Sequence, residues 1–254
     1  MGVLVTQLRP FFGYFGGKWR DALHSYPAPE HDTIVEPFAG SAGYSLRYHA
    51  KRIVLCEIDP TIASIWDYLI RVSAAEVLAI PDVPQGGTID DLDLPAEAKA
   101  LVGMWLNRGV ARPRKSPSKW MRDGVRPGSF WGERVRQTIA SQLRHIRHWE
   151  IHNCGYEEAP VVNEATWFID PPYVGAGHHY KHGASAIDFN ILAEWCRTQA
   201  GQVIACENEG AAWLPFRHLG SFKTTRSGRQ SKEVYWLNEW EQSRLEFEAA
   251  PRAA

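Results

Sequence analysis

The chain has 254 residues, of which 44% are hydrophobic and 22% charged, with a formal net charge of −1. This composition is typical of a globular protein with a full core and excludes a disordered or fibrous chain; the length allows one α/β domain, or one such domain with a smaller inserted module. The balanced charge excludes a generally basic, polyanion-binding protein, so any contact with nucleic acid has to come from a local cluster of charge.

The cysteines and the apolar segments indicate the cellular compartment in which the protein is expected. The cysteines show no CxxC spacing, which argues against a zinc site or a disulfide framework and predicts buried, reduced thiols. They are Cys56, Cys154, Cys196 and Cys206. Charged residues interrupt the N-terminal segment and no later stretch approaches roughly 18 uncharged apolar residues, so we expect a cytoplasmic protein without a membrane span.

The first distinctive elements in chain order are two glycine-containing segments. Tyr14–Lys18 reads YFGGK, which by itself indicates a turn followed by a solvated lysine. A strand is expected at 33–36, running into the small-residue segment Glu36–Gly43 (EPFAGSAG), with a helix after it at 44–50. This strand–turn–helix lets a ligand approach the backbone closely, although it differs from the dinucleotide fingerprint GxGxxG.

A second strand and helix follow. The apolar run 52–56 predicts a buried strand, and apolar residues between 62 and 70 predict a helix. Glu57, at the end of this strand, is placed to bind two ribose hydroxyls through charge-assisted hydrogen bonds. We interpret Asp59 instead as a helix N-cap, with Pro60 at the first helical position.

The middle of the chain is basic. Between 103 and 148 there are eleven Lys and Arg residues against two acids, a local charge of 11 − 2 = +9, interleaved with Trp105, Trp120, Phe130 and Trp131. Such residues bind DNA phosphates and read base edges, whereas the alternative is a merely solvated basic face. The candidates for DNA contact are Asn107, Arg108, Arg112, Arg114, Lys115, Lys119, Arg122 and Arg126.

The C-terminal part returns to alternating strands and helices, which predicts a mostly parallel sheet. Strands are expected at 166–169 and 202–206, with a helix at 189–199 between them. The loop 226–232 is basic and flexible, and either touches the DNA backbone or forms an ordinary hairpin. His178, His179 and His182 suggest metal binding, but we favour a mobile loop over a target base.

The tetrapeptide Asp170–Tyr173 (DPPY) directly follows the strand at 166–169. Its prolines fix an extended turn at the carboxyl end of the strand, where open α/β sheets bind ligands. The Asp170 carboxylate and the Pro171 carbonyl can accept hydrogen bonds from an aromatic amine, and Tyr173 offers a stacking face for an extruded base. The alternative is a strand that ends in an ordinary proline turn.

Taken in order, YFGGK, EPFAGSAG, the acid after a strand, the basic segment and DPPY resemble the Dam-like, alpha-group DNA adenine methyltransferases over residues 11–236. The resemblance implies an α/β fold, a seven-stranded Rossmann-like class I methyltransferase sheet, with S-adenosylmethionine as cofactor and S-adenosylhomocysteine as product. The catalytic domain would comprise 1–72 and 150–254, and an inserted, mainly helical module at 73–149 would recognise the target.

The resemblance also assigns residues. The catalytic set would be Asp170, Pro171, Pro172 and Tyr173. The cofactor-binding set would be Tyr14, Lys18, Glu36, Pro37, Phe38, Gly40, Gly43, Glu57, Tyr156 and Asp170. The chain departs from the family pattern at 153–157, where the usual acidic–aromatic pair is replaced by Asn-Cys-Gly-Tyr-Glu. Because Gly155 has no side-chain acceptor, stacking on Tyr156 or a backbone contact would have to serve.

The implied reaction is transfer of a methyl group to the exocyclic amino nitrogen of adenine, after base flipping in double-stranded DNA and without a metal. Alternatives are methylation of RNA adenine or a protein glutamine, and a sequence-specific DNA-binding protein that has lost catalysis. We expect a bacterial or phage enzyme, monomeric or homodimeric on DNA, and a solitary methylase rather than one paired with a restriction endonuclease. The recognition sequence does not follow from the residues.

Overall fold

A computed structural model of the chain describes residues 7–19, 25–84, 86–125, 128–174, 183–223 and 230–239. Its centre is a seven-stranded sheet with the order β3-β2-β1-β4-β5-β7-β6. The strands are β1 (Thr33–Glu36), β2 (Arg52–Cys56), β3 (Glu150–His152), β4 (Ala165–Ile169), β5 (Gly201–Asn208), β6 (Arg217–Lys223) and β7 (Gln230–Leu237).

The sheet is mostly parallel. β1 pairs in parallel with both β2 and β4, and β3 and β5 extend the parallel region on either side. β7 is antiparallel to its neighbours β5 and β6. The chain therefore moves outward from β1 to β3 and then returns to β4 and β5, which creates a topological switch point between β1 and β4, the place where such sheets bind ligands.

The strands are buried on both faces, and their side chains alternate between two hydrophobic clusters. Ile34 and Phe168 point into the larger cluster, whereas Val35 and Trp167, one residue away, point into the smaller one. This two-residue period follows from strand geometry. Apolar residues at consecutive positions are what the central strands of a two-sided sheet require.

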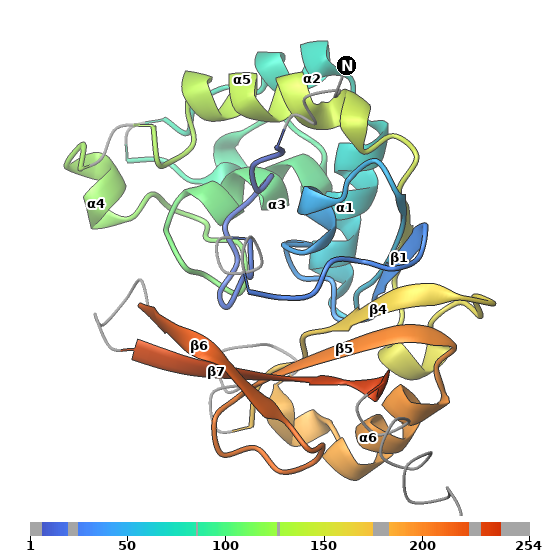
Figure 1. Cartoon of the computed structure of the whole chain (residues 1–254). Helices are drawn as coiled ribbons and strands as arrows, with labels where there is room; N and C mark the ends of the chain where they lie inside the picture. The colour runs from blue at the N-terminus through green and yellow to red at the C-terminus, as the bar shows by residue number, and fades with distance from the viewer. Residues whose placement is uncertain are drawn as a thin grey trace, which may run out of the picture.

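Helices cover both faces unequally (Figure 1). α1 (Pro60–Arg71), α3 (Ala96–Trp105) and α5 (Glu133–Gln142) lie on one face with the short α2 (Ala74–Ala79), and α6 (Phe189–Thr198) covers the other. α4 (Lys119–Arg122) projects from the helical side at the edge of the molecule. Short 3₁₀ turns connect these elements: Ser45–Arg47, Ile89–Asp91, Leu143–His145, Tyr156–Glu158 and Ala184–Ala186.

Most elements predicted from the sequence are confirmed, including the strands at 33–36 and 52–56 and the helix after Pro60. Asp59 caps that helix by accepting a hydrogen bond from the Thr61 backbone N–H. The helix predicted at 44–50 is wrong: only the 3₁₀ turn Ser45–Arg47 forms. The glycine turn ends at Gly43 and β2 begins at Arg52, which leaves too little chain for a helix and its connection.

The segment 73–149 is mainly helical, and its helices share the larger hydrophobic cluster with α1 and the sheet. Trp105 and Trp131, which alternate with basic residues in the sequence, are anchored in this core: their indole N–H groups donate to the carbonyls of Phe11 and Pro81. Phe130 is buried as well, whereas Trp120 on α4 is 63% exposed. Three of the four interleaved aromatic residues therefore serve packing.

Three of the four cysteines are buried thiols as expected, but Cys154 is only partly buried. No helix within the described ranges is long and apolar enough to cross a membrane.

Candidate functional site

A cavity of about 320 Å³ opens at the switch point, between the carboxyl ends of β1, β2 and β4 and the N-terminal segment. All ten residues assigned to the cofactor by resemblance line it, together with Pro172 of the catalytic set. These ten are Tyr14, Lys18, Glu36, Pro37, Phe38, Gly40, Gly43, Glu57, Tyr156 and Asp170. Residues that lie far apart in the sequence thus form a single cavity.

The glycine turn that forms the floor of the cavity is tightly constrained. Gly40 (φ +46°) and Ala42 (φ +50°) both adopt the left-handed region, which is unfavourable for a residue with a Cβ. A Cβ on Gly40 would lie 3.0 Å from the Tyr14 ring, and one on Gly43 would lie 2.6 Å from the Trp19 backbone nitrogen. The close approach that these glycines permit is therefore made by the protein's own YFGGK segment.

Glu36 is buried at the end of β1 and lines the cavity. One of its carboxylate oxygens accepts a 2.7 Å hydrogen bond from the Ser45 backbone N–H. Burial raises the pKa of Glu36 to about 8, although the hydrogen bonds from Ser45 oppose this shift. The carboxyl group therefore lies where a cation would stabilise its charged form.

Glu57 occupies the corresponding position at the end of β2. Its two carboxylate oxygens accept hydrogen bonds from the backbone N–H groups of Gly40 (3.0 Å) and Asp59 (2.9 Å). Burial raises the pKa of Glu57 to about 7. Each oxygen retains acceptor capacity, because a carboxylate has about four acceptor positions in all.

The side wall of the cavity beyond Glu57 is flat and apolar. Phe38 stacks on Tyr156 with ring centroids 5.5 Å apart and an interplanar angle of 26°. Ile58, directly after Glu57, also lines the cavity and is 49% exposed. An exposed isoleucine beside stacked rings suits a planar aromatic ligand.

Asp170 and Lys18 meet at the other end of the cavity. The Lys18 Nζ lies 3.3 Å from Asp170 Oδ1 and 3.5 Å from Glu233 Oε2, so the ammonium lies between two carboxyl groups. Burial raises the pKa of Asp170, and nearby Lys18 partly offsets that shift. Lys18, which the YFGGK segment alone would leave solvated, is therefore buried beside Asp170.

Tyr173 lies just behind this pair. The Lys18 Nζ is 4.4 Å from the Tyr173 ring centroid, and the Tyr173 hydroxyl donates a 2.7 Å hydrogen bond to Glu233. Neither Tyr173 nor the buried Pro171 is among the residues that line the cavity, so two of the four catalytic candidates are adjacent to it. His178, His179 and His182, which follow DPPY in the sequence, lie outside the residues that the structure describes.

Two acidic residues of this region were missed by the sequence analysis. Glu233 on β7 contacts Lys18 and Tyr173, and Glu207 on β5 accepts hydrogen bonds from the Val174 backbone N–H and the Trp213 indole, each 3.2 Å long. Both are buried. For Glu207 the signal is a glutamate directly after the apolar run of β5, because a buried carboxyl group requires partners; Glu233 follows three polar residues of β7 and carries no such signal.

The basic candidates fall into three groups. Arg108, Arg112, Arg114, Lys119 and Arg122 are exposed, and Arg126 lies outside the described residues. Lys115 is paired with Asp90 at 2.7 Å, and the Asn107 side chain accepts a hydrogen bond from the backbone N–H of Arg108.

Two further arginines counted in the basic segment have structural partners. Arg136 pairs with Asp82, and Arg147 donates to the carbonyls of Ile70 and Val72 at the end of α1. The positive charge free to meet a ligand is therefore smaller than the sequence count of +9.

The loop that carries Arg108 and Arg112 is hydrogen-bonded to the N-terminal side of the site. The Phe15 backbone N–H donates to the Val110 carbonyl (3.0 Å), which joins the YFGGK segment to the loop that carries Arg108 and Arg112. A Cβ on Gly103 would lie 2.8 Å from the Arg114 carbonyl oxygen, so the same loop packs closely on α3. Exposed arginines are thus held on a fixed loop next to the cavity.

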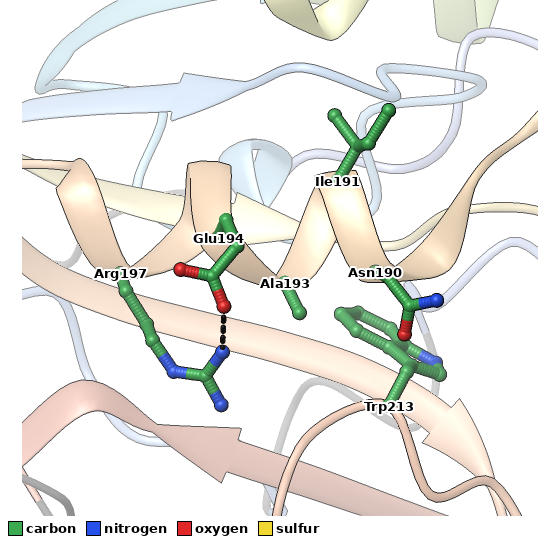
Figure 2. Close-up of a pocket in the computed structure, with 6 residues that line it drawn as sticks. All are labelled: Asn190, Ile191, Ala193, Glu194, Arg197 and Trp213. Atoms are coloured by element: carbon green, nitrogen blue, oxygen red, sulfur yellow. Dashed lines mark hydrogen bonds and ion pairs between the residues drawn. The ribbon is translucent and has the colours of Figure 1, made fainter.

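A second hollow, of about 330 Å³, lies on the outer side of α6. Figure 2 shows Trp213 beside Asn190 and the ion pair between Arg197 and Glu194, which are 2.8 Å apart. The pair already satisfies the charged groups of this hollow, and no glycine turn or strand end contributes to it. We therefore assign the functional site to the switch-point cavity.

No protein-family model matches the chain, and no curated protein is significantly similar to it. A conserved hypothetical protein from Streptococcus pyogenes is a similar solved structure, at 11% identity, with 82% of this chain and 86% of that chain covered and a TM-score of 0.37. At this distance the likeness carries no argument about function. Among the residues that the structure describes, no group of three or more His, Cys, Asp or Glu side chains could hold a metal ion.

Proposed function

We propose that the protein is an S-adenosylmethionine-dependent DNA methyltransferase that modifies the exocyclic amino nitrogen of adenine. The observation that carries this proposal is the acidic cavity at the switch point, with Asp170 and Lys18 at one end and a flat apolar wall at the other. The α/β sheet is accordingly interpreted as the Rossmann-like sheet of class I methyltransferases, and 73–149 as the target-recognition module.

The charge of the cavity supports a cationic ligand. Among the described residues that line it, six are acids and Lys18 is the one lysine or arginine. The acids are Glu36, Glu57, Asp59, Glu157, Asp170 and Asp188. A dinucleotide cofactor brings phosphates, which these carboxylates would repel, whereas a sulfonium with an α-amino group is attracted. When bound, S-adenosylmethionine supplies an electrophilic methyl group.

The protein's residues account for each part of this ligand. Glu36 and the glycine turn face the charged amino-acid part, and the Glu57 oxygens accept the two ribose hydroxyls. Ile58 and the Phe38–Tyr156 stack would hold the adenine ring of the cofactor. This wall replaces the acidic–aromatic pair that the sequence lacks at 153–157, so Tyr156 takes the stacking role expected of it.

The acceptor amine is assigned to the Asp170 end. An Asp170 oxygen and the Pro171 carbonyl accept its two N–H bonds, and this directs the nitrogen lone pair out of conjugation and along the cavity axis. A flipped adenine stacks on the face of Tyr173 opposite Lys18. The rate enhancement comes mainly from positioning and from fixed charges rather than from a strong general base.

Duplex DNA is the proposed substrate because of the exposed arginines held beside the cavity. They neutralise phosphates around the entrance, and the most exposed of them can read base edges in the major groove. Methylation of an RNA adenine or of a protein glutamine uses the same acceptor chemistry, and the substrate test below separates these cases. We propose a cytoplasmic, solitary enzyme of bacterial or phage origin, acting as a monomer or homodimer.

In the deciding experiment, the protein is incubated with labelled S-adenosylmethionine and plasmid DNA grown without adenine methylation. The DNA is then examined by nucleoside analysis and sequencing. The expected result is methyladenine at a recurring short motif. Incorporation into RNA or protein instead would preserve the chemistry and overturn the substrate. Cofactor binding without incorporation into any of the three would favour a DNA-binding protein that has lost catalysis.

A further inference from the structure

Glu233 lies on β7, one strand beyond the parallel part of the sheet, yet it reaches the Asp170 end of the site. Its carboxyl oxygen Oε2 lies 2.7 Å from the Tyr173 hydroxyl, 3.4 Å from the Tyr26 hydroxyl and 3.5 Å from the Lys18 Nζ. The residue is only 6% exposed. No role in the proposed reaction has yet been given to it.

We infer that Glu233 is a positioning residue for methyl transfer, which holds Tyr173 through its hydroxyl and shares Lys18 with Asp170. This inference rests on the proposed function and deepens it. Because Glu233 does not line the cavity, it acts through these two residues and touches neither the methyl donor nor the acceptor.

The first part of the role concerns Tyr173. A ring held only by packing can rotate, whereas this ring is fixed at both ends: Asp170 and the prolines fix its backbone, and Glu233 accepts from its hydroxyl. The Lys18 ammonium lies 4.4 Å from the ring centroid and favours the same orientation through a cation–π contact. The ring is thus held ready for a planar base before the base arrives.

The second part concerns Lys18. With one carboxyl group nearby, a buried lysine would direct its whole charge at that group. With two, at 3.3 and 3.5 Å, the ammonium is divided between Asp170 and Glu233. The ammonium therefore holds Asp170 less tightly than in an exclusive pair, which favours a hydrogen bond from the amino group that is to be methylated to Asp170.

The sequence neighbours of Glu233 show why a structural role alone is an insufficient explanation. Along β7, Tyr235 and Leu237 lie on the same face as Glu233 and pack in the larger hydrophobic cluster, and an apolar residue at 233 would pack against that cluster at no desolvation cost. A carboxyl group is used instead, and its partners are the residues of the site.

The test is Glu233→Gln, which preserves shape and an acceptor oxygen but removes the charge that attracts Lys18. We expect the single-turnover rate constant for methyl transfer to fall between about 10- and 100-fold, with cofactor Kd and thermal midpoint little changed. A second readout uses DNA with 2-aminopurine at the target position, whose fluorescence is quenched by stacking. Weaker quenching is expected with Glu233→Gln.

Glu209→Gln is the matched control, because Glu209 forms an exposed ion pair with Lys232, the residue next to Glu233. It should leave the rate constant, the cofactor Kd, the thermal midpoint and the quenching unchanged. Tyr173→Phe removes the hydroxyl that donates to Glu233, and Glu233→Gln weakens the same hydrogen bond by removing the charge of its acceptor, so the rate loss from Tyr173→Phe should be smaller in the Glu233→Gln background than in the wild type. Should Glu233→Gln fail to fold, Tyr173→Phe alone must reproduce the loss of rate and of quenching.

A wild-type rate in Glu233→Gln, or strictly additive losses in the double variant, overturns the inference. If Glu233→Gln weakens cofactor binding and stability as much as it lowers the rate, the residue is structural and the inference is also wrong. A wild-type protein that methylates no DNA contradicts the proposed function itself, which is a different outcome from an active wild type with an equally active Glu233→Gln.

Discussion

A Cβ atom on Gly43 would lie 2.6 Å from the backbone nitrogen of Trp19. The glycine turn after β1 and the N-terminal YFGGK segment therefore fit together only because Gly43 has no side chain. This contact brings Lys18 to Asp170 and the Tyr14 ring to Gly40. Two motifs that are each weak signals in the sequence are explained by a single packing relationship.

Gly43→Ala should separate these segments. Since the contact is with backbone atoms, the expected cost is about 1–3 kcal/mol of folding stability, with at least tenfold weaker cofactor binding. Thermal denaturation and calorimetric titration measure the two effects. Gly13→Ala is the matched control, because a Cβ there meets nothing within 4 Å. Equal behaviour of the two variants would show that the contact is not required.

The stability of the ligand-free protein should fall as pH rises. Glu36 and Glu57 have folded-state pKa values of about 8 and about 7, above the ordinary 4.5. A raised pKa means that the folded state binds more protons than the unfolded state. The contribution of each group to the free energy of unfolding is therefore fully present below pH 4.5, and it is lost as pH rises through 7 for Glu57 and 8 for Glu36. The loss is up to about 1.4 kcal/mol per pH unit for each group. Glu36→Gln should flatten this dependence in denaturant titrations. An unchanged slope would contradict it.

Binding of the cationic cofactor should release protons. At pH 7 the Glu36 carboxyl, with a pKa of about 8, is mostly protonated, and a cation beside it lowers that pKa. Calorimetry in two buffers of different ionisation enthalpy gives the number of protons released. Glu36→Gln should release fewer protons and bind the cofactor more weakly. Proton uptake on binding would exclude this arrangement.

Asp170→Ala should lose methyl transfer by about 100-fold or more while keeping its fold, because the acceptor amine loses its charged hydrogen-bond partner. Labelled-methyl incorporation and thermal denaturation measure these separately. Asp67→Ala, at an exposed position on α1, controls for a general loss of negative charge. Retained activity in Asp170→Ala would remove Asp170 from the mechanism.

The exposed arginines beside the cavity should govern DNA affinity. The double variant Arg112→Ala/Arg114→Ala is expected to weaken DNA binding about tenfold at low salt and to reduce the dependence of log Kd on log salt by about one to two. Fluorescence anisotropy at several salt concentrations measures both. Arg197→Gln, on α6 at the opposite face, should bind DNA like the wild type. An identical salt dependence in both variants would remove the loop from the interface.

The sequence predicted the sheet edge and the cavity well because those depend on local signals. Strand 33–36 and the Asp59 cap follow from an apolar run and a capping residue, and the residues that line the cavity follow from the order of motifs that carries the resemblance. The hydrogen bonds from Arg147 to the end of α1 and the Lys115–Asp90 pair did not follow, since such contacts depend on which surfaces meet. Glu233 was missed for a similar reason. It contacts Lys18 and Tyr173 only because β7 lies between β5 and β6 in the sheet.

The same antiparallel insertion has a consequence for biosynthesis. Lys18 and Glu233 lie 215 positions apart in the sequence, and of the strands that the structure describes β7 is the last to leave the ribosome. While β1 to β5 fold during translation, Glu233 has not yet been synthesised, so Lys18 can pair with Asp170 alone. Glu233 shares the Lys18 ammonium only after β7 has joined the sheet. We therefore expect the nascent chain to acquire the observed geometry of this site late in synthesis, in the step that inserts β7.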